Sequence, residues 1–309
     1  MRELLYILSP SFSGSTLLTF LLAAHPDIAT VGELKASAMG DVESYRCSCG
    51  ARLQQCDFWR KVKTGMEKSG AKFDFADFGT HFNSGPAWFK RLVRLGAKNA
   101  LLSYSSSQLL RILPSCRSRL NRIIEQNGIL IDLIASIQGG CLFLDGSKDP
   151  ERLTQLLVSR RWKIRVIHLL RDGRGIANSY RKHHNVDLKT AAIEWLRTDR
   201  ECLRVAARVA RQNVLTIKYE DVCQEPQRVL DEIFSFAGLA RNASPNGAAT
   251  LEHVLGNSMR LNGSKSILLD QKWRTDLLPQ DLEIFEAIAG DYNRSRGYHK
   301  SVSKEAILT

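Results

Sequence analysis

The stretch that decides the fold is LLYILSPSFSGSTLLTFLL, residues 4–22. Its apolar run at 4–8 predicts a buried strand, and the leucines at 17, 18, 21 and 22 predict the apolar face of a helix. Small residues fill the turn between them. Backbone N–H groups of such a turn converge at the helix N-terminus, where the helix dipole adds partial positive charge. The stretch therefore predicts a loop that binds phosphate or sulfate.

This loop matches the nucleotide-hydrolysing P-loop, G-x-x-x-x-G-K-[ST], only in part. Ser9 stands at the first glycine, Gly14 at the second, and Thr16 at the last position. Ser15 replaces the lysine that contacts the γ-phosphate of ATP or GTP. We therefore expect the loop to hold a phosphate without hydrolysing a nucleoside triphosphate.

The rest of the chain predicts a single α/β domain over residues 1–309. With 44% hydrophobic residues, a chain of this length can bury a substantial core. Strand-like runs alternate with helical patterns, which favours a central parallel sheet flanked by helices. The expected strands after the first are 28–31, 141–144, 164–170 and 214–217, and the expected helices are 150–160, 174–184, 188–211, 226–237 and 279–293.

The net charge of +12 indicates anionic ligands. Residues 79–124 contain basic side chains but no acidic one, and their apolar residues recur at helical spacing. We expect residues 79–140 to form a basic helical insert, either a solvated face or a lid that docks an anionic acceptor. Aromatic residues are few and no recognition motif accompanies the charge, so no nucleic-acid partner is expected.

No export signal or membrane span is predicted. The first apolar run is short and leads directly into the loop, and the apolar stretch 128–144 is interrupted by Asp132 and Gln138. The chain is therefore expected to be cytoplasmic.

A second motif lies at the end of the predicted strand 164–170. Arg171 follows the strand, and Ser179 lies eight residues later in the next predicted helix. A guanidinium and a hydroxyl arranged in this way can bind a second phosphate. The alternative is that Arg171 only caps the end of the sheet.

Together, in this order and spacing, the two motifs resemble those of the sulfotransferases that use 3′-phosphoadenosine 5′-phosphosulfate (PAPS). The stretch from 13 to 33 is similar to the opening of the tyrosylprotein sulfotransferases and of small bacterial sulfotransferases. Further elements that resemble this family are Lys148-Asp149-Pro150, Tyr219-Glu220-Asp221, and Gly256-Asn257-Ser258-Met259-Arg260 followed by Asp270 and Trp273.

The resemblance implies a P-loop-like sulfotransferase fold and a site for PAPS, with 3′-phosphoadenosine 5′-phosphate (PAP) as the product. It implies that the 3′-phosphate is held by Arg171 and Ser179. It also places Arg260 and Trp273 in a C-terminal cofactor loop, where Trp273 would stack on the adenine or close the loop. The residues implied around the 5′-phosphosulfate are Ser11, Phe12, Ser13, Gly14, Ser15 and Thr16.

One position departs from the family pattern. The family commonly has a basic residue before Ser-Gly, and here that position is Phe12. We expect Lys148 to supply the missing cation, although a surface lysine beside a helix start is the alternative. The resemblance also implies that Glu33, in its Gly-Glu context, accepts the acceptor's proton. The alternative is that Glu33 only caps a turn or pairs with a basic residue.

The expected activity is transfer of a sulfuryl group from PAPS to a hydroxyl or amine of a small-molecule, glycan or peptide acceptor of polar or acidic character. Catalysis would consist of positioning and electrostatic stabilisation, as in phosphoryl transfer. The alternatives are a P-loop kinase acting on a small molecule, which Ser15 disfavours, and a module that binds the cofactor without turnover.

Three cysteines lie close together at 47, 49 and 56. Their spacing lacks the paired C-x-x-C of a strong zinc motif, so the sequence favours thiols packed in a loop without metal. The alternative is that they supply three zinc ligands, with a fourth elsewhere in the chain. A catalytic cysteine is not expected, because the sequence indicates no histidine partner for any of the three.

Overall fold

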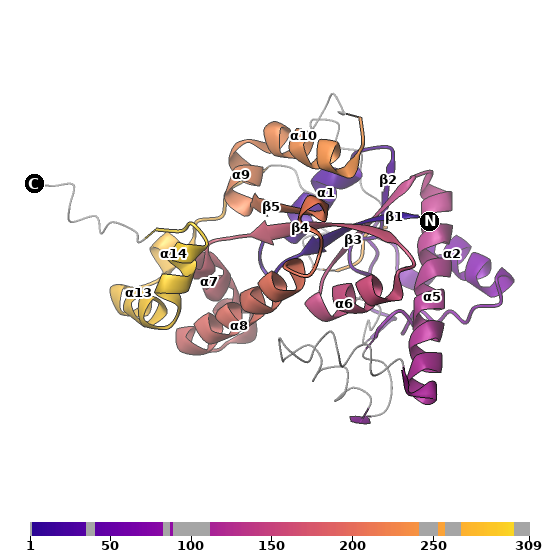
Figure 1. Ribbon diagram of the computed structural model, residues 1–309, viewed down its shortest axis with the longest axis horizontal. Helices are drawn as coiled ribbons and strands as arrows, with labels where there is room; N and C mark the ends of the chain where they lie inside the picture. Colours follow the sequence, from indigo (N-terminus) through magenta and orange to yellow (C-terminus); the bar gives the residue numbers. More distant parts are fainter. Residues whose placement is uncertain are drawn as a thin grey trace, which may run out of the picture.

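The computed structural model describes residues 2–34, 41–82, 87–88, 112–240, 253–256 and 267–299. A five-stranded parallel sheet of order β2-β3-β1-β4-β5 forms its centre (Figure 1). The strands are β1 (Glu3–Leu8), β2 (Ile28–Thr30), β3 (Leu142–Lys148), β4 (Lys163–Leu170) and β5 (Val214–Lys218). The predicted α/β class and parallel sheet are confirmed.

Helices connect the strands and pack around the sheet (Figure 1). The described residues also include short 3-10 turns at Leu53–Gln55 and Arg211–Asn213 and a π-helical turn at Glu286–Gly290. The helices are α1 (Ser15–Ala23), α2 (Asp57–Lys68), α5 (Pro114–Gln138), α6 (Pro150–Ser159), α7 (Gly173–His184), α8 (Leu188–Ala206), α9 (Tyr219–Gln224), α10 (Pro226–Ala237), α12 (Trp273–Asp276), α13 (Pro279–Phe285) and α14 (Asp291–Ser295).

The sheet has an apolar core on each face, and β1 contributes to both. Leu4, Tyr6 and Leu8 belong to the core that also contains buried residues of α2, α5 and α6, whereas Leu5 and Ile7 face α1 and α10. All five side chains are fully buried. A strand of a parallel sheet covered on both faces needs this continuous apolar character, because neither side of its pleat meets water.

The sheet order makes the carboxyl end of β1 the place where a ligand is expected. After β1 the chain builds β2 and β3 on one side of it, and then crosses to build β4 and β5 on the other. In open parallel sheets, ligands bind outside the carboxyl ends of the strands where the direction of winding reverses. The loop that follows β1 lies at this point.

The predicted insert at 79–140 is described only in part. Its second half is α5, a helix whose buried residues, among them Leu130, Ile131 and Ile134, pack into the core against β2 and β3. The exposed side chains of Arg117 and Arg122 lie on its first turns. Most of the predicted basic residues before α5 lie outside the described residues, so the function of this segment as a lid stays a prediction.

The sequence reading missed α2, which begins directly after the third cysteine. Its apolar residues Phe58, Trp59, Val62 and Met66 are buried at helical spacing against α5. Among the described residues, no helix is both long and apolar enough to cross a membrane.

Candidate functional site

The loop between β1 and α1 has the geometry that the sequence predicts. Gly14 is the residue before α1 and adopts a left-handed conformation with φ of 83°. A Cβ there would lie 2.2 Å from Cδ2 of Tyr219, so only glycine fits. Because the cap residue is a glycine, no side chain bonds the first N–H groups of α1, and these remain for a ligand.

The side chains of the loop lie partly inside the protein. Ser13 and Ser15 are buried, Phe12, Gly14 and Thr16 are half-buried, and Ser11 is exposed. The Ser13 hydroxyl donates to the Pro10 carbonyl at 2.8 Å and so closes the turn on itself. The Ser9 hydroxyl is buried without a hydrogen-bond partner among the described residues. An orphaned hydroxyl beside uncapped N–H groups is consistent with a site for an anionic ligand.

Glu33 and Lys148 meet beside this loop. Lys148 is the last residue of β3 and pairs in register with Leu8, the residue before the loop. An irregularity in the β1–β3 register precedes this pair, and Lys148 itself has a φ of 65°. Bulges of this kind re-aim side chains and are common next to active sites. The Lys148 ammonium contacts a Glu33 carboxylate oxygen at 2.5 Å, with both side chains about one-fifth exposed or less.

A buried network supports the end of β3. Arg152 and Asp145 form an ion pair at 2.8 Å with side chains that are at most 3% exposed. The Arg152 guanidinium also donates to the Asn127 amide oxygen at 2.7 Å and to the Thr80 carbonyl at 3.0 Å. Asp145 accepts from the Ser147 backbone N–H at 3.0 Å. The backbone next to Lys148 is therefore fixed by groups from α5, α6 and the segment before residue 82.

Glu33 is held from the other side by a segment far along the chain. Gly32 forms an isolated parallel bridge with Leu255, whose N–H donates to the Val31 carbonyl at 2.8 Å. Gly256 has a φ of 116°, and a Cβ on it would lie 2.9 Å from a Glu33 carboxylate oxygen. The segment 253–256 thus packs directly against Glu33.

Arg171 lies on the opposite flank of the loop. Its guanidinium donates to the Phe12 carbonyl at 2.7 Å and to the Asp270 carboxylate at 3.0 Å. It also lies over the Tyr219 ring, 4.5 Å from the centroid. Burial raises the pKa of Tyr219 to about 12, so its hydroxyl stays protonated and accepts the Asp270 N–H at 3.1 Å. Arg171 therefore joins the loop to the segment around Asp270.

Ser179 lies on the face of α7 that the Arg171 side chain contacts. A Cβ on Gly175 would lie 3.3 Å from Nε of Arg171, and Ser179 follows Gly175 by one helical turn on the same face. The Ser179 hydroxyl donates to the Gly175 carbonyl at 2.9 Å. Its oxygen keeps lone pairs, but a phosphate would need the hydroxyl proton to rotate away from that carbonyl.

Trp273 is buried beside a cavity of about 290 Å³ whose lining includes Arg171, Arg174 and Asp270. Two guanidinium groups lie over the Trp273 ring, those of Arg174 at 4.2 Å and Arg274 at 4.6 Å. The cavity lining carries charges of both signs, because Asp172, Glu220 and Asp270 lie among these arginines. The tryptophan already has cation–π partners.

A family model described as the sulfotransferase family matches residues 5–243. The chain belongs to the sulfotransferase family. This match includes the loop, Glu33, Lys148, Arg171 and Ser179, and it favours the sulfotransferase interpretation over the kinase alternative.

Solved structures agree on the fold of this sulfotransferase. A sulfotransferase domain from the curacin biosynthetic pathway is 18% identical, with a TM-score of 0.55 over 97% of this chain and 99% of that one. A sulfotransferase domain from the olefin synthase of Synechococcus PCC 7002 is 21% identical, with a TM-score of 0.51 over 93% and 94%. No curated protein matches the chain. At these identities the likeness concerns the fold.

Two histidines at the end of α7, for which the sequence favours a role at the helix end over one facing the site, lie beside the loop. Rings of Tyr180, His183 and His184, at the end of α7, surround Phe12, with the His183 centroid 5.4 Å from it. The histidines therefore stand beside the position where the family commonly has a basic residue. Arg260 lies outside the described residues.

The sequence missed His253. It lies with Cys47, Cys49 and Cys56 in one cluster, although it is separated from them by about two hundred residues. No local pattern in the sequence relates a histidine at this distance to the cysteines. Its approach follows from the bridge between Gly32 and Leu255.

Proposed function

We propose that this sulfotransferase binds PAPS at the loop after β1 and transfers its sulfuryl group to a hydroxyl or amine of an acceptor. The observation that carries the proposal is that charged side chains lie on both sides of the loop after β1. The Glu33–Lys148 pair stands on the β3 side of the loop, and Arg171 bonds the loop from the β4 side.

The residues at the loop fit the phosphosulfate group. Uncapped N–H groups at the start of α1, the absence of a side chain at Gly14 and the unpartnered Ser9 hydroxyl all suit an anion. Lys148 lies beside the same loop and would supply the cation that the loop lacks because residue 12 is a phenylalanine. PAPS would supply the activated sulfuryl group. The protein's part is to bind, orient and stabilise charge.

Arg171 and Ser179 are proposed to bind the 3′-phosphate. Arg171 already donates to Phe12 and Asp270, and a guanidinium has five N–H donors, so it can donate to a phosphate while keeping the Phe12 contact. The Asp270 carboxylate competes with the phosphate for the same cation. Although burial by itself would raise the pKa of Asp270, the Lys272 N–H and Arg171 hold that pKa below its usual range.

Glu33 is proposed to accept the proton that the acceptor loses as its oxygen or nitrogen bonds to sulfur. Lys148 would stabilise negative charge on the phosphate oxygen from which the sulfuryl group departs. Because the two side chains touch, Lys148 also orients the carboxylate. Such groups act mainly by preorganised electrostatics and proton transfer, worth about 10²–10⁴-fold each.

For the acceptor, we propose a polar or acidic small molecule, glycan or peptide. The related domains come from the curacin pathway and from an olefin synthase. Small molecules with a free hydroxyl are therefore the first acceptors to test.

The test begins with calorimetric titration of the protein with PAP, in parallel with ATP and magnesium. We expect PAP to bind and ATP not to bind; the reverse would contradict the proposal and favour the kinase. Transfer is then followed with ³⁵S-labelled PAPS over a panel of acceptors.

The variant Glu33→Gln assigns the base. It should bind PAP as the wild type does and transfer sulfate about 10²–10⁴-fold more slowly. Retained transfer would remove Glu33 from this function. PAP binding by the wild type with no product on any acceptor would instead support a cofactor-binding module.

A further inference from the structure

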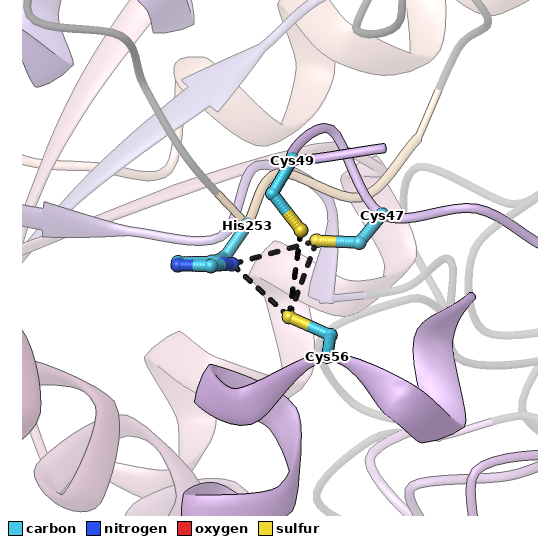
Figure 2. A group of neighbouring side chains, drawn as sticks. All are labelled: Cys47, Cys49, Cys56 and His253. Carbon is cyan, nitrogen blue, oxygen red and sulfur yellow. Dashed lines mark hydrogen bonds between the residues drawn. The ribbon is translucent and has the colours of Figure 1, made fainter. Parts of the chain in front are cut away.

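Three cysteines and one histidine converge away from the loop after β1. Figure 2 shows the sulfur atoms of Cys47, Cys49 and Cys56 and the Nδ1 of His253 pointing toward one another. These four atoms all lie within 4.8 Å of one another. Cys47 and Cys56 are buried, His253 is half-buried and Cys49 is exposed. Solvent therefore reaches the cluster at Cys49.

Four of the six distances within the cluster are close to the edges of a tetrahedral metal site, and the other two are at most 4.8 Å. The sulfur of Cys56 lies 3.7 Å from that of Cys49 and 3.8 Å from that of Cys47. His253 Nδ1 lies 3.2 Å from the Cys56 sulfur and 3.6 Å from the Cys47 sulfur. Zinc bonds of about 2.3 Å to sulfur and about 2.0–2.1 Å to nitrogen imply edges of about 3.8 Å and about 3.6 Å in a tetrahedron.

The same distances argue against a disulfide in this state, because bonded sulfurs lie about 2.05 Å apart. All seven cysteines are free thiols. Three thiolates and one imidazole form a ligand set typical of structural zinc, and the tetrahedral arrangement of sulfur and nitrogen favours zinc over harder cations.

Local backbone structure positions each of the three sulfur atoms. Cys47 and Cys49 lie in a tight turn. The Cys47 N–H donates to the Ala51 carbonyl at 2.9 Å, and Gly50 has a φ of 87°. Cys56 is the residue before α2, so the start of that helix carries the third sulfur.

The fourth ligand is held by stacking and by an uncommon backbone. The His253 ring stacks on Phe58, with centroids 4.5 Å apart and planes 2° from parallel. His253 also has a φ of 75°, a conformation that a residue with a side chain rarely adopts. A metal bond to its imidazole would compensate for this backbone conformation.

We propose that Cys47, Cys49, Cys56 and His253 bind one structural zinc ion. The sequence favoured thiols without metal, and the geometry favours the alternative. Binding would replace the thiol protons by bonds to zinc and release those protons to solvent.

The zinc would tie the turn at 47–51 and the start of α2 to the segment 253–256. The same segment donates from Val254 to the Ser48 hydroxyl at 2.8 Å and from Gly256 to the Tyr45 hydroxyl at 3.1 Å. It also pairs with Val31 and packs against Glu33. Since these contacts join residues far apart in the sequence, the metal would act as a cross-link that fixes the wall beside Glu33.

The experiment measures metal in the full chain, purified without chelators or a metal-affinity resin. Elemental analysis by mass spectrometry should find one zinc ion per chain. Cys49→Ser should weaken zinc binding by about a hundredfold or more, since even outer-shell changes reduce metal affinity by about 10–100-fold. The matched control is Cys141→Ser, which removes another exposed cysteine and should leave the zinc content unchanged.

Two further measurements keep the test decisive if Cys49→Ser folds poorly. His253→Cys offers a fourth thiolate and should retain zinc, whereas His253→Ala should lose it. Wild-type protein freed of zinc and titrated with Co²⁺ should develop the absorption bands of a tetrahedral thiolate complex. Wild-type protein that contains no zinc and gives no such bands would overturn the proposal, as would zinc content that is equal in all variants.

This inference does not rest on the proposed donor or acceptor, because metal content is measured without either. Failure to bind PAP would leave a positive zinc result intact. Absence of zinc would leave a positive PAP titration intact.

Discussion

The two strands that flank β1 place different side chains beside its last residue. At the last residue of β1, Leu8 is flanked by Lys148 of β3 on one side and by His168 of β4 on the other. Lys148 is charged, partly exposed and paired with Glu33, whereas His168 is 2% exposed. On the β4 side the charge appears later, at Arg171, which is itself bonded to the loop.

This difference separates two tasks at one loop. The β3 side offers two side chains that are open to a reacting group and oriented by each other. The β4 side offers a guanidinium already fixed by a carbonyl, a carboxylate and an aromatic ring. The first arrangement suits chemistry and the second suits binding. Substitutions on the two sides should therefore affect different measured quantities.

The largest expected effect is on the β3 side. Lys148→Ala should lower turnover about 10²–10³-fold, because it removes a cation beside the departing charge. The affinity for PAP, measured by calorimetry, should change much less. Lys163→Ala removes a mostly exposed lysine at the start of β4 and serves as the control. A loss of PAP affinity as large as the loss of turnover would contradict the assignment of Lys148 to the chemical step.

Arg171→Ala tests the β4 side. We expect PAP to bind about a hundredfold more weakly, because charge-assisted hydrogen bonds to a phosphate are lost. Turnover at saturating donor should fall only a few-fold. The control is Arg165→Ala, an arginine within β4 that is likewise paired with a carboxylate, that of Glu3. If turnover falls and binding holds, Arg171 belongs to the chemistry and the assignment fails.

Acid should act on the β4 side through His168. Burial, with a further contribution from Arg296, lowers the pKa of His168 to about 3 from 6.5. The unfolded chain therefore binds a proton below pH 6.5 that the folded protein does not bind. Stability should fall as the pH drops, by about 2 kcal/mol between pH 7.5 and pH 5.

Urea unfolding at several pH values measures this slope. His168→Gln does not titrate and should lose that part of the pH dependence, whatever its own stability. An unchanged slope in His168→Gln would show that other groups cause the acid sensitivity. The window ends at pH 5 because Asp199, whose pKa is raised by burial, contributes with the opposite sign at lower pH.

The smallest expected effect sharpens the assignment of Arg171. Asp270→Asn removes a carboxylate that competes with phosphate for the guanidinium. PAP should bind about three- to tenfold more tightly, which corresponds to the modest worth of a partly exposed ion pair. Calorimetry at two salt concentrations measures the change. Weaker binding in the variant would show that Asp270 supports the site instead of competing for it.

Much of the fold and of the loop could be predicted from the sequence. Continuous apolar runs identified the strands, and the Ser9–Thr16 turn identified the loop, because both signals are local. Glu33 and Lys148 were predicted separately, and a basic partner for Glu33 was expected only as an alternative that did not name Lys148. Their pairing depends on the parallel register of β2, β3 and β1, which no local pattern encodes.

The cysteine cluster shows where sequence reasoning ends. Cys47, Cys49 and Cys56 were visible as a group, but their spacing is not that of a strong zinc motif. The deciding residue, His253, reaches them through a bridge between Gly32 and Leu255. The competing carboxylate at Arg171 was missed for the same reason, since Asp270 is brought there by tertiary contacts.

The sheet order also constrains how the chain can fold as it is synthesised. β1 and β2 emerge first, but β3 occupies the position between them, and β3 begins only at Leu142. An early β1–β2 pair would have to separate again before β3 could insert. Long-range parallel pairing of this kind is slow and leaves strand edges open. The position beside β1 can therefore be filled only after more than a hundred further residues have been made, and until then that edge of β1 has no partner from β3.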